Sequence, residues 1–281
     1  MLARRSNNGA FWLACLLACT PSVQATPSDD QRQLRQYYQR LFPQLQLQDY
    51  GNGVYAIDAI ARSSWQAIEE FPPYQPALEQ GQVLFATAFK NGRHYADCFQ
   101  RQGIGIAHYY PQWDSHKGAV VTLAQAVNDC RIANQEAPLD ALKGSMAQLL
   151  AYMAFTSRGQ PISVVIPDND PRALQAYQQG RAFYYQHRGQ LNFACATCHI
   201  QNAGKKLRSE TLSPALGHTN SWPTYRLKWG ELGTLQRRFN ECLVQVKAPV
   251  FPPSSIEFNN LEYFLAYMGN GVNITGPSTR K

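Results

Sequence analysis

The chain has 281 residues, of which 44% are hydrophobic and 16% charged, and a formal net charge of +7. This composition is typical of a globular protein with one large core or two small ones, and it excludes an intrinsically disordered chain. The basic residues are scattered without long runs, so nothing indicates nucleic-acid binding, and the mild positive charge favours a small anion or an acidic partner.

Residues 1–25 have the pattern of a cleavable signal peptide. Two arginines precede the apolar run FWLACLLAC, and the triplet VQA then offers small residues at a cleavage site. The apolar run is much shorter than the ~20 residues that span a bilayer, so no membrane span is expected. A lipid anchor on Cys19 is an alternative that fits the pattern less well. We therefore expect export to the periplasm.

Beyond an N-terminal helical extension, residues 26–75, the chain resembles itself. The segment TLAQAVNDC from Thr122 aligns with TLQRRFNEC from Thr234, and LAYM follows each of them. No zinc or solenoid repeat has this period, so the pattern predicts two tandem, mainly α domains related by duplication. We place them at residues 76–172 and 173–281. The stretch QGRAFYYQHRGQ predicts a helix that enters the second domain.

The segment CATCH, Cys195 to His199, is the C-x-x-C-H attachment signature of c-type haem. On the opening turn of a helix, Cys195 and Cys198 can form thioethers to the two haem vinyl groups. His199 then presents its imidazole to the iron as the proximal ligand. A redox disulfide or half of a zinc site are alternatives, but no second C-x-x-C completes a zinc pair and no βαβ pattern surrounds the motif. Both domains are therefore expected to be cytochrome c-like.

The sixth iron ligand must come from elsewhere in the chain. Met268, His218 and Cys242 are candidates, and spacing alone does not choose among them. Met153 stands at the position of Met268 in the copy without a haem motif, which favours a packing role for both methionines. Met268 therefore ranks behind Cys242.

The first domain has lost the means to attach haem. Cys98 stands where Cys195 would, but the residues after it include neither a second cysteine nor a histidine. The first domain is therefore expected to be haemless, with one haem c in the whole chain. Cys98 and Cys130 would flank the vacated space, and in an oxidising compartment we expect them to form a disulfide that contributes ~3–4 kcal/mol.

Cys242 then remains unpaired. The stretch TLQRRFNECL has no Gly or Pro in its middle, which predicts a helix from Leu235 onward. Arg238 lies four residues before Cys242 and shares its helical face. A guanidinium there can lower the pKa of the thiol and offer two parallel hydrogen bonds to an oxyanion. Arg237, one residue off that face, is expected in solvent or at an interface, and Arg226 and Lys228 are expected along a basic rim.

Three segments together carry a resemblance to a known family: CATCHIQNAGKKLRSE, RLKWGELGTLQRRFNECL and EFNNLEYFLAYMGNG. They resemble the SoxA subunit of the periplasmic SoxAX cytochromes that oxidise thiosulfate. The resemblance covers most of the mature chain, and the combination of C-x-x-C-H with R-x-x-x-C is specific. The missing haem motif at Cys98 places the sequence with the one-haem members.

The resemblance implies an L-cysteine S-thiosulfotransferase. Such an enzyme couples thiosulfate to a cysteine on a flexible arm of the SoxYZ carrier, and two electrons leave through haem. The resemblance also implies a heterodimer with the SoxX cytochrome c. It gives Cys195 and Cys198 as haem attachment residues, and His199 and Cys242 as axial ligands. Cys242 would also be the catalytic cysteine, found in the family as a persulfide, and Arg238 would bind the substrate. The alternative is a pure electron-transfer cytochrome in which the thiolate only tunes the potential.

Overall fold

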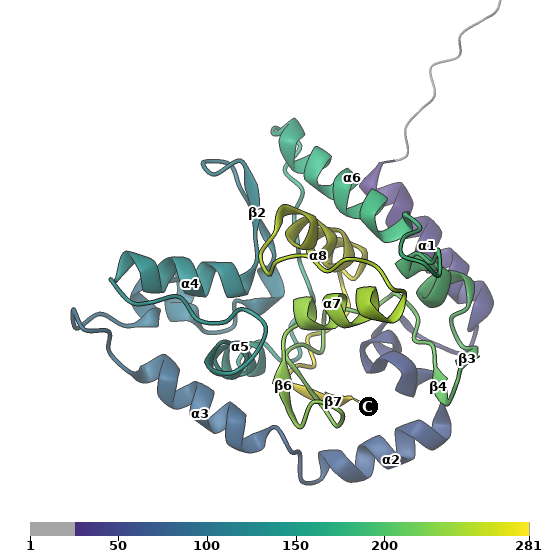
Figure 1. Ribbon diagram of the computed structural model, residues 1–281, viewed down its shortest axis with the longest axis horizontal. Helices are drawn as coiled ribbons and strands as arrows, with labels where there is room; N and C mark the ends of the chain where they lie inside the picture. Colours follow the sequence, from purple (N-terminus) through teal and green to yellow (C-terminus); the bar gives the residue numbers. More distant parts are fainter. Residues whose placement is uncertain (1–25, 281) are drawn as a thin grey trace, which may run out of the picture.

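The structure is a computed structural model that describes residues 26–280, so the expected signal peptide lies outside its described part. The described chain is rich in helices and has a few short strands (Figure 1). The helices are α1 Pro27–Leu41, α2 Ala59–Glu69, α3 Gln75–Ala86, α4 Leu123–Ala133, α5 Ser145–Phe155, α6 Pro171–Tyr185, α7 Leu235–Gln245 and α8 Ile256–Met268. Between residues 26 and 280, no helix is long and apolar enough to cross a membrane.

The strands form three small sheets. The hairpin β1 Gln112–Asp114 with β2 Ala119–Val121 precedes α4, and the hairpin β3 Lys206–Leu207 with β4 Glu210–Thr211 follows the C-x-x-C-H segment. The third sheet has the order β6-β5-β7, formed by β5 Thr224–Arg226, β6 Glu231–Gly233 and β7 Ser278–Arg280. Strands β5 and β6 are antiparallel, whereas β5 and β7 are parallel.

Several helices begin at residues with capping side chains. The Thr122 hydroxyl accepts a hydrogen bond from the Gln125 amide at the start of α4 (3.2 Å), and Asp170 caps α6, whose first residue is a proline. Both arrangements satisfy donors that an isolated helix end would leave unpaired. Helix α7 begins at Leu235, as expected. Helix α6 covers the first part of the predicted helix at 179–190 but ends at Tyr185, and an isolated bridge and a tight turn follow it.

Two helix crossings organise the two halves of the chain. Helix α3 crosses α5, and α6 crosses α8, each through a glycine. A Cβ atom at Gly81 would lie 2.0 Å from the Gln148 carbonyl oxygen, and one at Gly180 would lie 1.9 Å from that of Asn260. Only glycine allows backbones to approach so closely. Each half continues from its first helix to an antiparallel hairpin, β1–β2 or β5–β6, and then two further helices (Figure 1). The second half has an additional hairpin, β3–β4, before β5.

The first half has its own apolar core, closed by a disulfide. Buried side chains of α3, α4 and α5 form this cluster, with Val127 and Met153 both fully buried. Cys98 and Cys130 are joined by a disulfide with a Cα–Cα distance of 5.8 Å, within the usual range of such bonds. Cys98 is exposed and Cys130 is buried, so the bond ties a surface loop to the core.

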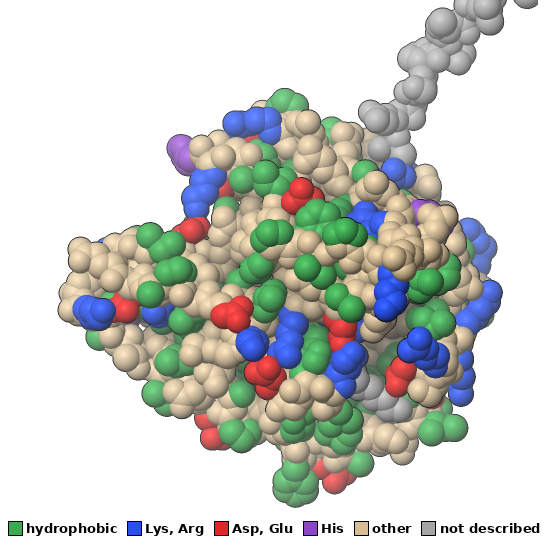
Figure 2. Space-filling view, viewed as in Figure 1, with side chains coloured by type: hydrophobic (Ala, Val, Ile, Leu, Met, Phe, Trp, Pro, Cys, Tyr) green, Lys and Arg blue, Asp and Glu red, His purple; other side chains and the backbone are tan. Residues whose placement is uncertain are grey.

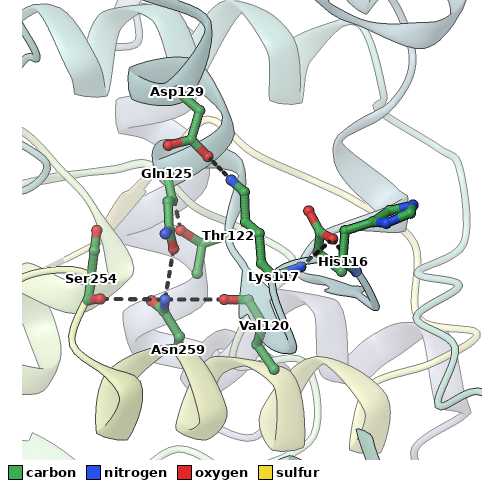
Figure 3. Close-up of polar contacts among 9 residues, drawn as sticks. His116, Lys117, Val120, Thr122, Gln125, Asp129, Ser254 and Asn259 are labelled. Carbon is green, nitrogen blue, oxygen red and sulfur yellow. Dashed lines mark hydrogen bonds and ion pairs between the residues drawn. The ribbon is translucent and has the colours of Figure 1, made fainter. Parts of the chain in front are cut away.

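A buried polar network joins the two halves (Figure 3). Asn259 on α8 directs its side-chain amide nitrogen to Gln125 Oε1 (2.8 Å) and to the Val120 carbonyl (3.2 Å), both in the first half. Nearby, Lys117 of the β1–β2 hairpin pairs with Asp129 of α4 at 2.6 Å. A buried amide without partners costs about 1–3 kcal/mol, so this network favours one docking of the halves.

The N-terminal segment packs against the second half. Helix α1 contacts α8, and Tyr38 of α1 is completely buried in the core of the second half. Helix α2 contacts β7 near the end of the chain, where Glu69 accepts a hydrogen bond from the Thr279 amide (2.8 Å). The extension therefore forms part of the surroundings of the C-x-x-C-H segment, and not a separate unit.

Candidate functional site

The C-x-x-C-H residues lie on one helical turn. A π-helical turn spans Thr197–Gln201, and the Thr197 hydroxyl accepts a hydrogen bond from the Ala194 amide (3.0 Å) just before it. His199 Nδ1 donates to the Ser213 carbonyl (2.9 Å), so its Nε2 keeps a free lone pair. Metal-bound histidines commonly use their second nitrogen in this way, because the bond fixes the tautomer and the ring orientation.

Burial determines the protonation of these groups. It lowers the pKa of His199 to about 4, so that the imidazole is neutral at physiological pH, as a metal ligand must be. Burial raises the pKa of the free Cys195 thiol to about 12. The Tyr184 hydroxyl is also buried, and it has no hydrogen-bond partner among residues 26–280.

Helix α7 brings Cys242 to the same site. Besides burial, the electrostatic influence of Cys242 raises the pKa of both Cys195 and Cys198, which places the three thiols within electrostatic range of one another. Cys242 in turn is the largest influence on Arg238 and raises the pKa of its guanidinium. The residues that the sequence predicts to bind haem and substrate thus lie at one site.

A cluster of cations surrounds the carboxylate next to Cys242. Arg238 Nη1 donates to Glu241 Oε2 at 2.5 Å, Lys228 contacts Oε1 of the same carboxylate, and Arg226 Nε lies 3.8 Å from Oε2. Burial would raise the pKa of Glu241, but these cations lower it below its ordinary value, so the carboxylate is ionised. Burial and the charge of Arg238 lower the pKa of Arg226 to about 10.

The charges of this cluster do not balance. Three cations contact or approach Glu241, and Glu210 acts on Arg226 and Arg238 as a second, weaker negative charge, which leaves one positive charge in excess over the carboxylates. Arg238 is only about a quarter exposed. Basic and acidic side chains also gather on the visible face over α7 and the β5–β6 hairpin (Figure 2). A partly desolvated excess of positive charge attracts anions, and arginine can hold tetrahedral oxyanions with two parallel hydrogen bonds.

The neighbouring arginine has different surroundings. Arg237 Nη1 lies 2.9 Å from Glu231 Oε1, and its guanidinium lies over the Trp229 ring, 4.3 Å from the centroid. Both partners belong to the β5–β6 hairpin or its turn. Arg237 is therefore occupied in holding α7 to this hairpin, whereas Arg238 belongs to the cluster around Glu241.

Neither of the other two candidates lies where a sixth ligand opposite His199 would have to be. The His218 ring packs edge-on against His199, with centroids 4.4 Å apart, which leaves no room for an iron atom between the two rings. Met268 is 3% exposed, and its sulfur accepts a hydrogen bond from the Tyr177 hydroxyl (3.5 Å) between α6 and α8. Met268 thus packs in the helix core. Cys242 is the candidate that lies beside the attachment cysteines.

These groups fit a c-type haem. Two thiols three residues apart, a neutral imidazole with a free Nε2 and a third sulfur are the donors that such a group requires. The orphaned Tyr184 hydroxyl beside the cysteines is consistent with a partner that is not part of the polypeptide.

Sequence reasoning missed two contributors to this site and gave others little weight. Ser213 holds the His199 ring through its backbone carbonyl, and Tyr38 contacts the His199 backbone from the N-terminal extension. No motif marks either residue. Arg226 and Lys228 were expected only along a rim, but both reach the carboxylate next to Cys242.

The helix-rich fold and the C-x-x-C-H turn define a c-type cytochrome. Residues 80–162 match the family model described as SoxA/TsdA, cytochrome c domain. The chain is 53% identical over 261 residues to the L-cysteine S-thiosulfotransferase subunit SoxA of Allochromatium vinosum, covering 93% of this chain and 92% of that protein. It is 44% identical to the same subunit of Chlorobaculum tepidum, covering 97% and 96%.

A solved structure agrees with these relatives. The crystal structure of SoxXA from P. pantotrophus superposes with a TM-score of 0.71 and 30% identity, covering 78% of this chain and 84% of that chain. The chain belongs to the SoxA family of L-cysteine S-thiosulfotransferase subunits. This confirms the predicted family, the enzyme class and the cytochrome c-like fold.

Proposed function

We propose that this chain catalyses the coupling of thiosulfate to a cysteine of the SoxYZ carrier, with Cys242 as the catalytic residue. In this reaction a sulfur–sulfur bond forms between the outer sulfur of thiosulfate and the carrier thiol. The thiol loses its proton and two electrons leave. The observation that carries the proposal is the gathering of Cys242, the haem-attachment cysteines and Arg238 in one site.

We assign the haem-binding roles as follows. Cys195 and Cys198 would hold one haem c covalently, and His199 and Cys242 would ligate its iron. The hydrogen bond from His199 Nδ1 to Ser213 supports the proximal role, since it orients the ring and frees Nε2. When bound, the haem supplies the one-electron acceptor through which the two electrons leave in turn. Cys242 supplies the sulfur nucleophile, which the family resemblance implies as a persulfide.

The cation cluster binds the anionic substrate. Thiosulfate carries two negative charges, and the cluster of Arg226, Lys228 and Arg238 carries more positive charge than the carboxylates Glu241 and Glu210 beside it supply negative charge. Of the three cations, Arg238 alone is on the same helix as Cys242, one turn before it. Its guanidinium can donate two parallel hydrogen bonds to the sulfonate oxygens. Holding the sulfonate there would direct the outer sulfur of thiosulfate toward Cys242.

Replacement of Arg238 by alanine is expected to raise the KM for thiosulfate roughly 10- to 100-fold and to leave the haem attached, because a partly buried charge-assisted contact contributes about 1.5–3 kcal/mol. The measurement is carrier-thiol modification by mass spectrometry over a range of thiosulfate concentrations. Arg237→Ala is the matched control, since its charge is taken up by Glu231 and Trp229. Equal kinetics of the two variants would remove Arg238 from the substrate site.

We also propose that the two halves are cytochrome c-like domains related by duplication and that the first one is haemless. The equivalent glycine crossings and the common element order support the duplication. The cytochrome c family model matches residues 80–162, which contain no C-x-x-C-H, and this supports a degenerate first domain. The domains proposed are residues 76–172 and 173–281, after the extension 26–75. Helix α6 begins two residues before the second boundary.

The biological setting follows from the family. The solved relative from P. pantotrophus is described as SoxXA, and we propose a heterodimer with SoxX as the partner of this chain. We propose a periplasmic location on the pattern of residues 1–25, with cleavage after Ala25. Haem c, a disulfide and an exported carrier would then share one oxidising compartment.

The intact mass of the purified mature chain is expected to correspond to residues 26–281 plus one haem and less the two hydrogens of the Cys98–Cys130 disulfide. A persulfide on Cys242 would add ~32 Da, the mass of one sulfur, and would disappear on reduction. Cys242→Ala serves as the control for that sulfur. A mass with two haems, or with none, would contradict the proposed site.

A further inference from the structure

The N-terminal extension places a buried hydroxyl against the backbone of His199, the proposed proximal ligand. Tyr38 of α1 has no exposed surface, and its ring lies among other aromatic rings of the core. Its hydroxyl donates to the His199 carbonyl (2.5 Å) and accepts from the Ala215 amide (2.8 Å). Both hydrogen-bonding capacities of one phenol are thus used on two segments far from it in sequence.

The two segments that Tyr38 joins are those that hold the imidazole. One is the C-x-x-C-H turn, which carries His199. The other is the loop at 213–215, whose Ser213 carbonyl accepts the hydrogen bond from His199 Nδ1 (2.9 Å). Tyr38 therefore closes a ring of contacts from the His199 backbone through Ala215 and Ser213 back to the His199 side chain. A shift of either segment would change the geometry of the Nδ1 hydrogen bond.

We propose that Tyr38 is a positioning residue for the proximal ligand, through which the N-terminal extension controls the electron-donating strength of His199. The hydrogen bond at Nδ1 makes an imidazole a stronger donor at Nε2, and such donation stabilises the oxidised metal. Tyr38 keeps that bond short by fixing both of its ends. The inference rests on the proposed role of His199 as an iron ligand, and the extension is then part of the redox site.

Tyr38→Phe removes the hydroxyl and keeps the ring. In the purified haem-loaded protein, we expect the midpoint potential to shift upward and the low-spin EPR g-values to change, with hydrogen exchange in the 213–215 loop faster than in the wild type. Tyr37→Phe is the matched control. It lies on the same helix, and its hydroxyl donates to the Ile200 carbonyl (2.9 Å) of the same turn but contacts neither the His199 carbonyl nor the 213–215 loop. It should therefore shift the potential and the g-values less than Tyr38→Phe does, and an equal shift in both variants would contradict a specific role of Tyr38.

Equal spectra and potentials in Tyr38→Phe and the wild type, whatever the change in Tm, would overturn the positioning role. If Tyr38→Phe does not accumulate with haem, hydrogen exchange of the Ala215 amide in the wild type is measured instead. Exchange as fast as in an unprotected loop would contradict the positioning role, because the Tyr38 hydroxyl should protect this amide. His199→Met separates this from the proposed function. An unchanged low-spin spectrum in His199→Met would remove His199 as a ligand, whereas failure of Tyr38→Phe alone leaves the ligand assignment intact.

Discussion

Replacement of Cys242 by methionine is expected to reduce thiosulfate coupling to the carrier thiol by on the order of 10³-fold or more, with the haem still covalently attached. A methionine sulfur can ligate iron, but it cannot form a covalent sulfur adduct and pass it to another thiol. Attachment depends on Cys195 and Cys198, which the substitution leaves in place. The measurement is single-turnover modification of the carrier cysteine, followed by mass spectrometry.

The same substitution should raise the haem midpoint potential. A thiolate is an anionic donor that stabilises the oxidised iron, and a thioether lacks this charge. Met268→Leu is the control, because Met268 packs between α6 and α8 and its loss should change neither the spectrum nor the coupling. Coupling that persists in Cys242→Met while the potential rises would make the chain an electron carrier whose thiolate only tunes the haem.

Much of this site was predictable because its strongest signals are local in sequence. The C-x-x-C-H spacing belongs to one helical turn, and Arg238 and Cys242 are one turn apart on α7. Comparison of the two halves ranked Met268 behind Cys242, and the buried position of Met268 agrees with that order. Such inferences need only the period of a helix and the chemistry of the side chains.

The remaining parts of the site depend on contacts between distant segments. Tyr38 lies 161 residues before His199, and Ser213 acts through its carbonyl, a group that every residue has. Arg226 and Lys228 reach Glu241 because the β5–β6 hairpin folds back on α7. Neither hydrophobic period nor residue type reveals these approaches, so the sequence could predict the ligands but not the groups that orient them.

The length of α6 shows a related limit. The stretch 179–190 was expected to be helical throughout, but α6 ends at Tyr185. Gly189 has a φ of +71°, and a Cβ atom there would lie 2.1 Å from the Val246 carbonyl. The chain after α6 thus turns tightly against the end of α7, and this approach requires glycine. The helix ends because of a contact with a segment that follows much later in the sequence.

Gly180→Ala is expected to destabilise the protein by about 3 kcal/mol or more, although the same change in an exposed helix stabilises by about 1 kcal/mol. The reversal of sign comes from the α6–α8 crossing, where the added Cβ would lie 1.9 Å from the Asn260 carbonyl, so the helices must separate and α8 loses its packing. Thermal unfolding followed by haem absorbance should show a Tm lower by roughly 6–12 °C. Gln178→Ala, on the exposed face of α6, is the control and should leave the Tm within about 2 °C.

Gly81→Ala makes an equivalent clash of 2.0 Å with the Gln148 carbonyl in the first half. If the halves are duplicated domains built on the same crossing, the two glycine variants should lose similar stability. A loss in Gly180→Ala alone would show that only the second half depends on such a crossing, and would count against the duplication.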